Sequence, residues 1–390
     1  MQVAYFGAYI VYSPVAGMMI RRFGYKKGGV YHGLTLFCIG ALMFWPSAHF
    51  EKYGAFVGSS FVIASGLATL EVTANSYVTV LGTPEQAAFR LNFSQAFNGL
   101  ASFCGPLIAS KYFFSGGNQH SLGTVQYVYL AVACLGALVM VLFFFAALPE
   151  ITDEDMDEQQ AEAGIVDTRS FWRPHLILGF ITQLMYVGAQ VSTASFVMNY
   201  LTDKHDFPND EAARLFSYMQ ITFMAARFIS TPLLRFFDPA TVLFFYGLGC
   251  TLFTLVATFT GGKAGLASLF LVFFFESVCY PTTFTLATGN MGVYTKRAAS
   301  LVVMGVGGGA FYPSAQGALA DAKGAQLSYI LNAVGFAFVA AYGAYMRFNR
   351  IKETKRENIE AARTISNSSQ DKIQVEDEKL EAPAHLTRLA

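Results

Sequence analysis

The chain has 390 residues, of which 54% are hydrophobic and 13% are charged, and its formal net charge is zero. A soluble domain carries about 25% charged residues, and the sequence has no basic cluster large enough to indicate a nucleic-acid partner. The five cysteines all lie inside apolar runs, so neither a disulfide framework nor a CxxC metal site is expected. This composition indicates an all-α protein that crosses a membrane several times.

Apolar runs of about 20 residues are long enough to cross a hydrocarbon core as helices. The first group covers residues 3–20, 28–48, 54–81, 89–113 and 125–148, and the second covers 174–201, 212–236, 239–260, 264–291, 298–320 and 326–348. Alternating segments of about ten residues, which would indicate a membrane β-barrel, are not seen. We therefore predict five spans, a linker and six further spans.

The orientation follows from lysine and arginine in the short loops, which favour the cytoplasm. Arg21, Arg22, Lys26 and Lys27 lie between the first two predicted spans, and further basic residues fall on the same side by alternation. We therefore expect Met1 outside, the carboxyl terminus in the cytoplasm, and an integral protein of the plasma membrane.

Four regions are predicted from these runs: an N-terminal helical bundle at 1–148, an acidic cytoplasmic linker at 149–173, a C-terminal six-helix bundle at 174–348, and a polar tail at 349–390. The linker is interpreted as a solvated tether between the bundles. The tail has the mixed charge and low hydrophobicity of a disordered segment.

The two groups of spans show a weak internal repeat. Arg90 is followed sixteen residues later by Pro106, and Arg297 is followed at the same distance by Pro313. A carboxylate precedes each arginine, Glu71 in one half and Glu276 in the other. Such symmetry is similar to the major facilitator architecture, which pairs two six-helix repeats around a substrate site near the middle of the membrane.

Polar side chains form stripes on four of the predicted helices. At 100° per residue, the members of each stripe share a face: Glu71 with Asn75; Asn92, Gln95, Asn98 and Ser102; Gln183, Tyr186, Gln190 and Thr193; and Glu276, Tyr280, Thr283 and Asn290, with Pro281 expected to bend the last helix. These stripes would line one wet cavity, and amides with aromatic rings suit a neutral sugar. The alternative is that some of them only join helices by hydrogen bonds.

Glu71 is the strongest functional candidate, because a carboxyl group inside a membrane span is costly and is commonly functional. Burial favours its neutral form, which suits a group that binds and releases a proton. The alternative is a structural acid held by a nearby Asn or Arg. Glycines 305 and 307–309 are interpreted as close-packing sites, because no Lys-Ser/Thr pair follows them.

An enzyme is not expected. The six histidines are scattered, the sequence has neither an HExxH zinc motif nor a GxSxG nucleophile elbow, and the loops are too short for a soluble catalytic domain. We expect no cofactor and no metal, with the proton as coupling ion. The expected partners are a small-molecule sugar and the lipid bilayer, without nucleic acid, and the protein is expected to be a monomer.

The stretch GLATLEVTANSYVTVLGTPEQAAFRLNFSQAFNGLASFCGP at 66–106 resembles the L-fucose:proton symporter family of the major facilitator superfamily. The resemblance continues at MYVGAQVSTASFVMNYL (185–201) and at YPTTFTLATGNMGVYTKRAASLVVMGVGGGAFYPSAQGALAD (280–321), so it covers nearly all of the membrane part. It implies proton-coupled uptake of a monosaccharide such as L-fucose, galactose or glucose, by alternating access. It also implies a proton-coupling role for Glu71, sugar contacts for Asn98 and Gln95, and a place on the cavity wall for Tyr186 and Gln190.

Two departures from this family accompany the resemblance. The family uses an aspartate on its first helix for protonation, and no such helix is found here, so we expect eleven spans with the first helix missing. Arg21 also stands where the superfamily's first loop signature has an aspartate.

Besides symport, two further hypotheses stay open at this stage. The first is a membrane sensor that binds sugar without transporting it, and the second is a uniporter whose uptake does not respond to a pH gradient. From the residues alone, the candidate sugar contacts are Asn75, Glu276 and Tyr280, in addition to those that the resemblance implies.

Overall fold

The structure is a computed structural model that describes residues 1–113, 122–152, 155, 170–205 and 207–352, with side chains for all of these except 102–113, 122–126, 204 and 205. The described residues are helical throughout their regular elements, as predicted. Met1–Ala344 form one compact unit. The residues from Tyr345 onward form a second unit, of which Tyr345–Lys352 are described and helical.

The N-terminal bundle contains five long helices: α1 (Gln2–Gly24), α2 (His32–His49), α3 (Tyr53–Val80), α4 (Ala87–Phe113) and α5 (Leu122–Phe145). A π-helical segment, η1 (Tyr25–Tyr31), joins α1 to α2, and a short turn, η2 (Pro84–Gln86), precedes α4. Helix α3 packs against both α1 and α2, and α5 covers α2.

The C-terminal bundle begins with α7 (Pro174–His205) and α8 (Asn209–Ser230), followed by the short α9 (Leu233–Phe236) and by α10 (Pro239–Phe259). Three predicted spans then continue the chain. They comprise α11 (Gly262–Phe275), η4 (Glu276–Val278) and α12 (Cys279–Thr288); η5 (Gly292–Tyr294), α13 (Thr295–Met304), η6 (Gly305–Ala310) and α14 (Tyr312–Lys323); and a last helical stretch, Ala325–Lys352, which starts with α15 (Ala325–Ser328).

Eight stretches of the described residues are long and apolar enough to cross a membrane. One of them, Gln2–His49, contains two of the predicted spans, and two other predicted spans correspond to α4 and α8, which are not among the eight. The helical class is therefore confirmed, whereas the count of eleven spans stays a prediction.

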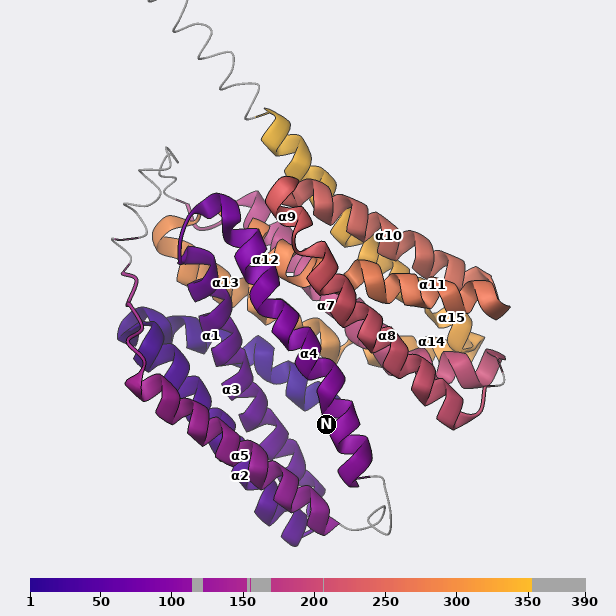
Figure 1. Cartoon of the computed structure of the whole chain (residues 1–390), viewed down its shortest axis with the longest axis horizontal. Coiled ribbons are helices and arrows are strands. Elements are labelled where there is room, and N and C mark those ends of the chain that lie inside the picture. Colours follow the sequence, from indigo (N-terminus) through magenta and orange to yellow (C-terminus); the bar gives the residue numbers. More distant parts are fainter. Residues whose placement is uncertain (114–121, 153–154, 156–169, 206, 353–390) are drawn as a thin grey trace, which may run out of the picture. The chain divides into compact units, whose positions relative to one another are not determined.

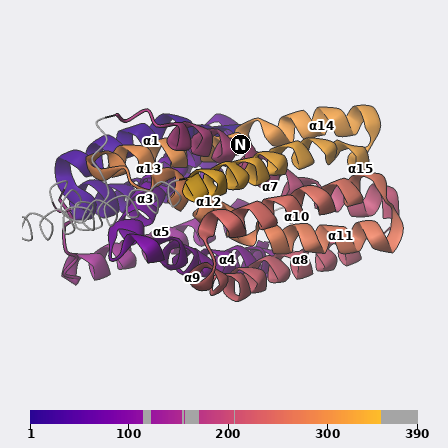
Figure 2. The same cartoon turned by 90° about the horizontal axis from the view of Figure 1, so that it is seen from above.

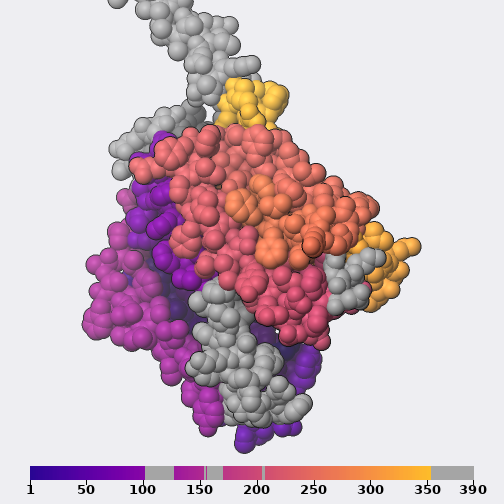
Figure 3. Space-filling view, turned by 45° about the vertical axis from the view of Figure 1, so that its right-hand side comes forward, coloured from indigo at the N-terminus to yellow at the C-terminus, as the bar shows by residue number. Residues whose placement is uncertain are grey.

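The bundles lie side by side, with α1–α5 in indigo to magenta and α7 to α15 in pink to yellow (Figures 1 and 2). They meet where α1 packs on α13 and η6, where α3 packs on α13, and where α4 packs on α8 and α12. In the space-filling view the two groups of colours are in direct contact in the upper part of the molecule (Figure 3).

The predicted bend in the span 264–291 is present. Helix α11 ends at Phe275, and the 3-10 turn η4 separates it from α12. Pro281 has no N–H and its ring crowds the carbonyl four residues earlier, so the Ser277 carbonyl has no helical donor. A side chain from another helix supplies the missing hydrogen-bond donor, as described below.

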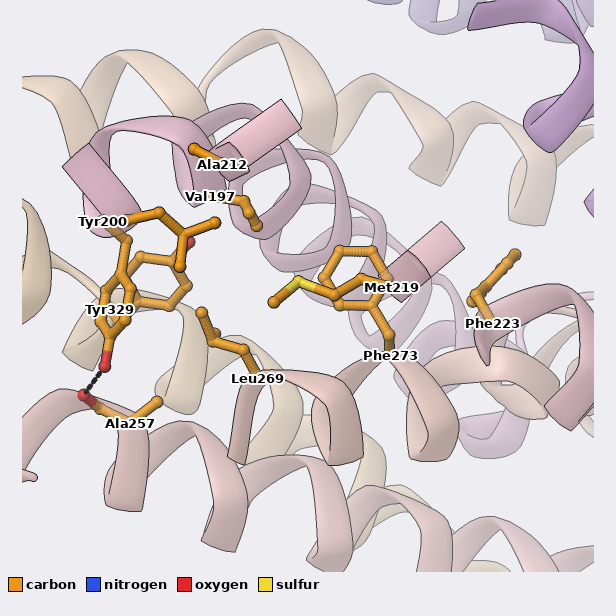
Figure 4. Packing of buried hydrophobic residues seen from close by; sticks show 10 residues of the cluster. Val197, Tyr200, Ala212, Met219, Phe223, Ala257, Leu269, Phe273 and Tyr329 are labelled. Atoms are coloured by element: carbon orange, nitrogen blue, oxygen red, sulfur yellow. Dashed lines mark hydrogen bonds between the residues drawn. The ribbon is translucent and has the colours of Figure 1, made fainter. Parts of the chain in front are cut away.

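A cluster of buried apolar side chains fixes α8 against α7 and α11 (Figure 4). Met219 and Phe223 of α8 face Leu269 and Phe273 of α11, and the Tyr200 hydroxyl of α7 donates to the Ala257 carbonyl at 2.9 Å. The guanidinium group of Arg227, one turn after Phe223, lies 4.5 Å from the centre of the Phe223 ring. This cluster therefore sets the position of a buried cation.

Candidate functional site

Glu71 lies on α3 and is partly exposed, although its neighbours in the sequence are largely buried. Its carboxyl group lies near two phenol hydroxyls, those of Tyr9 on α1 and Tyr280 on α12. The two tyrosines belong to different bundles. The carboxyl group is therefore a point where both halves of the molecule converge on one titratable side chain.

A chain of amides extends this site along α3 and α4. The Gln95 Nε2 donates to Asn75 Oδ1 at 2.8 Å, and Asn75 Nδ2 reaches the Tyr280 hydroxyl at 3.5 Å. Asn75 follows Glu71 by one helical turn, as the spacing predicted, and only 1% of its surface is exposed. Gln95, Asn75, Tyr280 and Glu71 thus form one continuous polar chain, and the structure brings four predicted site residues together.

Two further predicted residues are accessible. Asn98 is exposed on α4, one turn after Gln95, and Gln190 on α7 is partly exposed. Gln183 of the same α7 stripe is fully buried and approaches the Tyr280 hydroxyl, although neither of its amide atoms has hydrogen-bond geometry with a partner. The α7 stripe therefore presents one amide to the surface and one to the polar chain.

Tyr186 and Glu276 are buried behind this chain. The Tyr186 hydroxyl donates to the backbone carbonyl of Glu276 at 2.7 Å, and Glu276 is 2% exposed. Glu276 is the first residue of the 3-10 turn η4 between α11 and α12, and Tyr186 contacts this turn from α7.

Arg227 is a site residue that sequence reasoning missed. It is 3% exposed, and its Nε donates to the Ser277 carbonyl, which Pro281 leaves without a helical donor. Its Nη1 donates across the bundle interface to the Gln95 carbonyl at 2.9 Å. The available signal was an arginine in the middle of the apolar run 212–236, whose other arginines, Arg214 and Arg235, lie near its ends; a charged residue at the middle of a span is as exceptional as Glu71.

Tyr9 was also missed, because a tyrosine in an apolar span does not stand out by composition. The spacing of Tyr5, Tyr9 and Tyr12 at four and three residues indicates one helical face. That face carries the hydroxyl that reaches Glu71.

Other polar residues of the stripes join helices by hydrogen bonds, which was the alternative to a place on the cavity wall. Asn92 Nδ2 on α4 donates to the Thr282 hydroxyl of α12 at 3.1 Å, and Thr193 accepts from Asn332 Nδ2 at 3.0 Å. The side chain of Ser102 lies outside the described residues. Among those that are described, no group of three His, Cys, Asp or Glu side chains is placed to hold a metal ion.

The glycines of η6 are close-packing sites, as predicted. A Cβ at Gly307 would meet Ile10 of α1, and one at Gly309 would meet Phe6. At Gly308 it would overlap the backbone carbonyl of Leu184 on α7. The segment therefore lets α1 and α7 approach it from both sides.

The sequence of this chain is similar to those of known membrane transporters. The family model described as Major Facilitator Superfamily matches residues 1–311. The glucose/galactose transporter of Brucella abortus (strain 9-941) is 33% identical over 349 residues, covering 88% of this chain and 83% of the relative. The L-fucose-proton symporter of Escherichia coli K12 is 32% identical over 343 residues, covering 82% and 77%.

The fold of this chain also matches solved structures of transporters. The crystal structure of the transporter FucP in the outward conformation matches with a TM-score of 0.76 and 27% identity over 88% of both chains. The human organic anion transporter MFSD10 matches with a TM-score of 0.68 and 14% identity, covering 88% of this chain and 82% of that one, which shows a common fold alone.

Proposed function

Because the chain belongs to the major facilitator superfamily, we propose that it is a secondary active transporter for a neutral monosaccharide, driven by protons through alternating access. Relatives named as glucose/galactose transporters and L-fucose-proton symporters support a sugar of the glucose, galactose or L-fucose type. Transporters of this architecture bind their substrates near the middle of the membrane, between the two repeats.

The observation that carries the proposal is the convergence of both bundles on Glu71. A protonated carboxyl group can donate one hydrogen bond and accept others, whereas the ionised group only accepts. The hydroxyls of Tyr9 and Tyr280, which reach Glu71 from opposite bundles, therefore report its protonation to both halves. Sugar hydroxyls can take the place of these donors, which links sugar binding to the proton.

We assign direct sugar contacts to Gln95, Asn98, Asn75, Gln190 and Tyr280, because these residues belong to the polar chain or are accessible beside it. Asn75 and Tyr280 are buried in this conformation, as are Tyr186 and Glu276, so all four would touch sugar only after a rearrangement. No metal or organic cofactor enters this proposal.

The test is Glu71→Gln in proteoliposomes loaded with galactose, glucose or L-fucose. Counterflow exchanges sugar without net proton movement, so we expect it to continue, whereas accumulation driven by a pH gradient is lost because the amide cannot ionise. Glu85→Gln, an exposed carboxylate of η2, is the matched control and keeps both activities. Uphill uptake by Glu71→Gln at the wild-type rate contradicts the role of Glu71.

Two outcomes with the wild-type protein would replace the proposal. Uptake that ignores the pH gradient indicates a uniporter, and sugar binding without flux indicates a sensor. Either result would be seen before any variant is made.

The proposed setting is the plasma membrane, with a monomeric protein whose carboxyl terminus is cytoplasmic. The basic loop between α1 and α2 supports this orientation. Single cysteines at Lys27 and Lys263, both exposed and at opposite ends of the helices, test it in intact cells. A membrane-impermeant maleimide is expected to label position 263, and labelling of position 27 instead reverses the orientation.

A further inference from the structure

Glu276 carries a carboxyl group that is buried inside the C-terminal bundle. Its Oε2 has no hydrogen-bond partner, and the hydrogen bond that Tyr186 donates from α7 goes to the backbone carbonyl of Glu276. An ionised carboxylate in such a place costs several kcal/mol unless it is paired. The geometry is therefore that of a neutral, protonated acid.

Arg227 supports a neutral Glu276, because it is the buried cation beside this carboxyl group and does not form an ion pair with it. Its guanidinium group donates to the carbonyls of Ser277 and Gln95. A guanidinium group beside an ionised carboxylate would form the stronger charge-assisted bond instead. In this state the charge of Arg227 is stabilised by two neutral carbonyls and by the Phe223 ring.

The groups around Glu276 offer no other cation among the described residues. They are Arg227 of α8, Tyr186 of α7, Cys250 of α10, Cys279 of α12 and Tyr329, which follows α15. Apart from Arg227, all are neutral at physiological pH in their ordinary state. A negative charge on Glu276 would therefore act mainly on Arg227.

Gln95 connects this pair to the sugar site. Its backbone carbonyl accepts from Arg227, and its side chain donates to Asn75, which leads to Tyr280 and Glu71. A shift of the guanidinium group away from this carbonyl would remove one of the contacts that hold α4 to the C-terminal bundle. It would also move the first amide of the polar chain.

We propose that Glu276 is a second proton-binding carboxyl group of the transporter, and that Arg227 links its protonation to the sugar site through the Gln95 carbonyl. This inference rests on the proposed sugar–proton symport and assigns to it a second site in the other bundle. When Glu276 releases its proton to water, the carboxylate attracts the guanidinium group, which leaves Gln95. Arg227 acts here as a positioning residue.

The first experiment measures the sugar dissociation constant against pH by isothermal titration calorimetry on the purified full chain. We expect affinity to fall in two steps as pH rises, since each carboxyl group must be neutral for tight binding. Glu276→Gln, nearly isosteric with the neutral acid, should lose one step, and Glu71→Gln should lose the other. Each step should change the dissociation constant by roughly 5–150-fold, the usual range of coupling between sites.

The outcomes separate the two proposals. Sugar binding by the wild type that does not depend on pH overturns the proposed symport itself. A two-step wild type with an unchanged profile in Glu276→Gln overturns only the role of Glu276. Glu85→Gln is the matched surface control and should keep both steps.

Arg227 is tested by the shape of the same profile, which a merely structural role would not alter. Arg227→Gln should lose the Glu276 step and keep the Glu71 step, and Arg227→Lys should restore part of it because the charge is kept. Two unchanged steps in Arg227→Gln contradict the link through Arg227.

A second measurement covers the case in which Glu276→Gln does not fold. Infrared difference spectra of Glu71→Gln over a pH titration should still show the C=O stretch of a buried protonated carboxyl group at neutral pH. Its absence overturns the inference without any substitution at Glu276.

Discussion

At the scale of single residues, Gln95 serves two purposes that can be separated by substitution. Its backbone carbonyl binds Arg227, and its side chain supplies the donor that Asn75 Oδ1 accepts at 2.8 Å. Replacing the side chain leaves the backbone contact in place. The amide chain can therefore be tested without disturbing the contact between the bundles.

We predict that Gln95→Leu weakens sugar binding by roughly 5–150-fold, because the sugar group that contacts this amide in our proposal is left buried without its partner, at a cost of about 1–3 kcal/mol. Thermal stability should fall as well, because the buried Asn75 oxygen loses its donor in the sugar-free protein. Calorimetry of sugar binding measures the effect. Gln86→Leu, an exposed amide of η2, is the control, and equal losses in the two variants would count against the amide chain.

At the scale of elements, the 3-10 segment η6 allows α7 to approach the C-terminal half of the α13 span. A Cβ at Gly308 would overlap the Leu184 carbonyl, which is backbone and cannot rotate aside. We predict that Gly308→Ala lowers stability by about 1–3 kcal/mol through overpacking. Gly58→Ala on α3, where nothing lies within 4 Å of an added Cβ, should be neutral or stabilising.

Thermal unfolding of the two glycine variants in detergent decides this prediction. A midpoint for Gly308→Ala at or above the wild-type value would show that η6 and α7 can separate at little cost. Transport should fall with stability in Gly308→Ala and stay normal in Gly58→Ala.

The elements themselves were largely predictable, because lipid leaves an apolar chain few alternatives to helices. The run 174–201 corresponds to α7, and Pro281 correctly indicated a bend. Arg227 was not predicted, because an average over an apolar window hides one charge. Its partners, Ser277 and Gln95, lie 50 and 132 residues away along the chain. Side-chain spacing gives the face of a helix, whereas the opposing helix comes only from the tertiary structure.

At the scale of the whole molecule, the first residues of the linker connect the two bundles. The Glu150 carboxylate accepts from the backbone N–H groups of Tyr25 and Lys26 at 2.8 and 2.9 Å. From the other bundle, Lys296 Nζ donates to the Ile151 carbonyl at 3.2 Å and lies 5.2 Å from the centre of the Tyr25 ring. These contacts hold α1 and α13 together at the end of the molecule that carries the linker.

The alternating access that we propose requires this end to open, so the contacts of Lys296 would break once in each cycle. We predict that Lys296→Met shifts the population toward the form that is open at the linker end, because the variant loses both the charge and the donor. A carbonyl contact to a charged group contributes about 1.5–3 kcal/mol, which corresponds to a roughly 10–150-fold change in the ratio of the two forms.

Spin labels at exposed positions 27 and 235, one on each bundle, report this ratio as a distance distribution when the native cysteines are replaced. Lys296→Met should move the distribution to longer distances in the absence of sugar, whereas Lys263→Met, at the exposed start of α11, should leave it unchanged. The Met variant at 296 should also bind sugar more weakly from the outside, since fewer molecules are open to that side. If its distances match those of the wild type, the linker end is held closed by the packing of α1 and α3 on α13, and the lysine only adds stability.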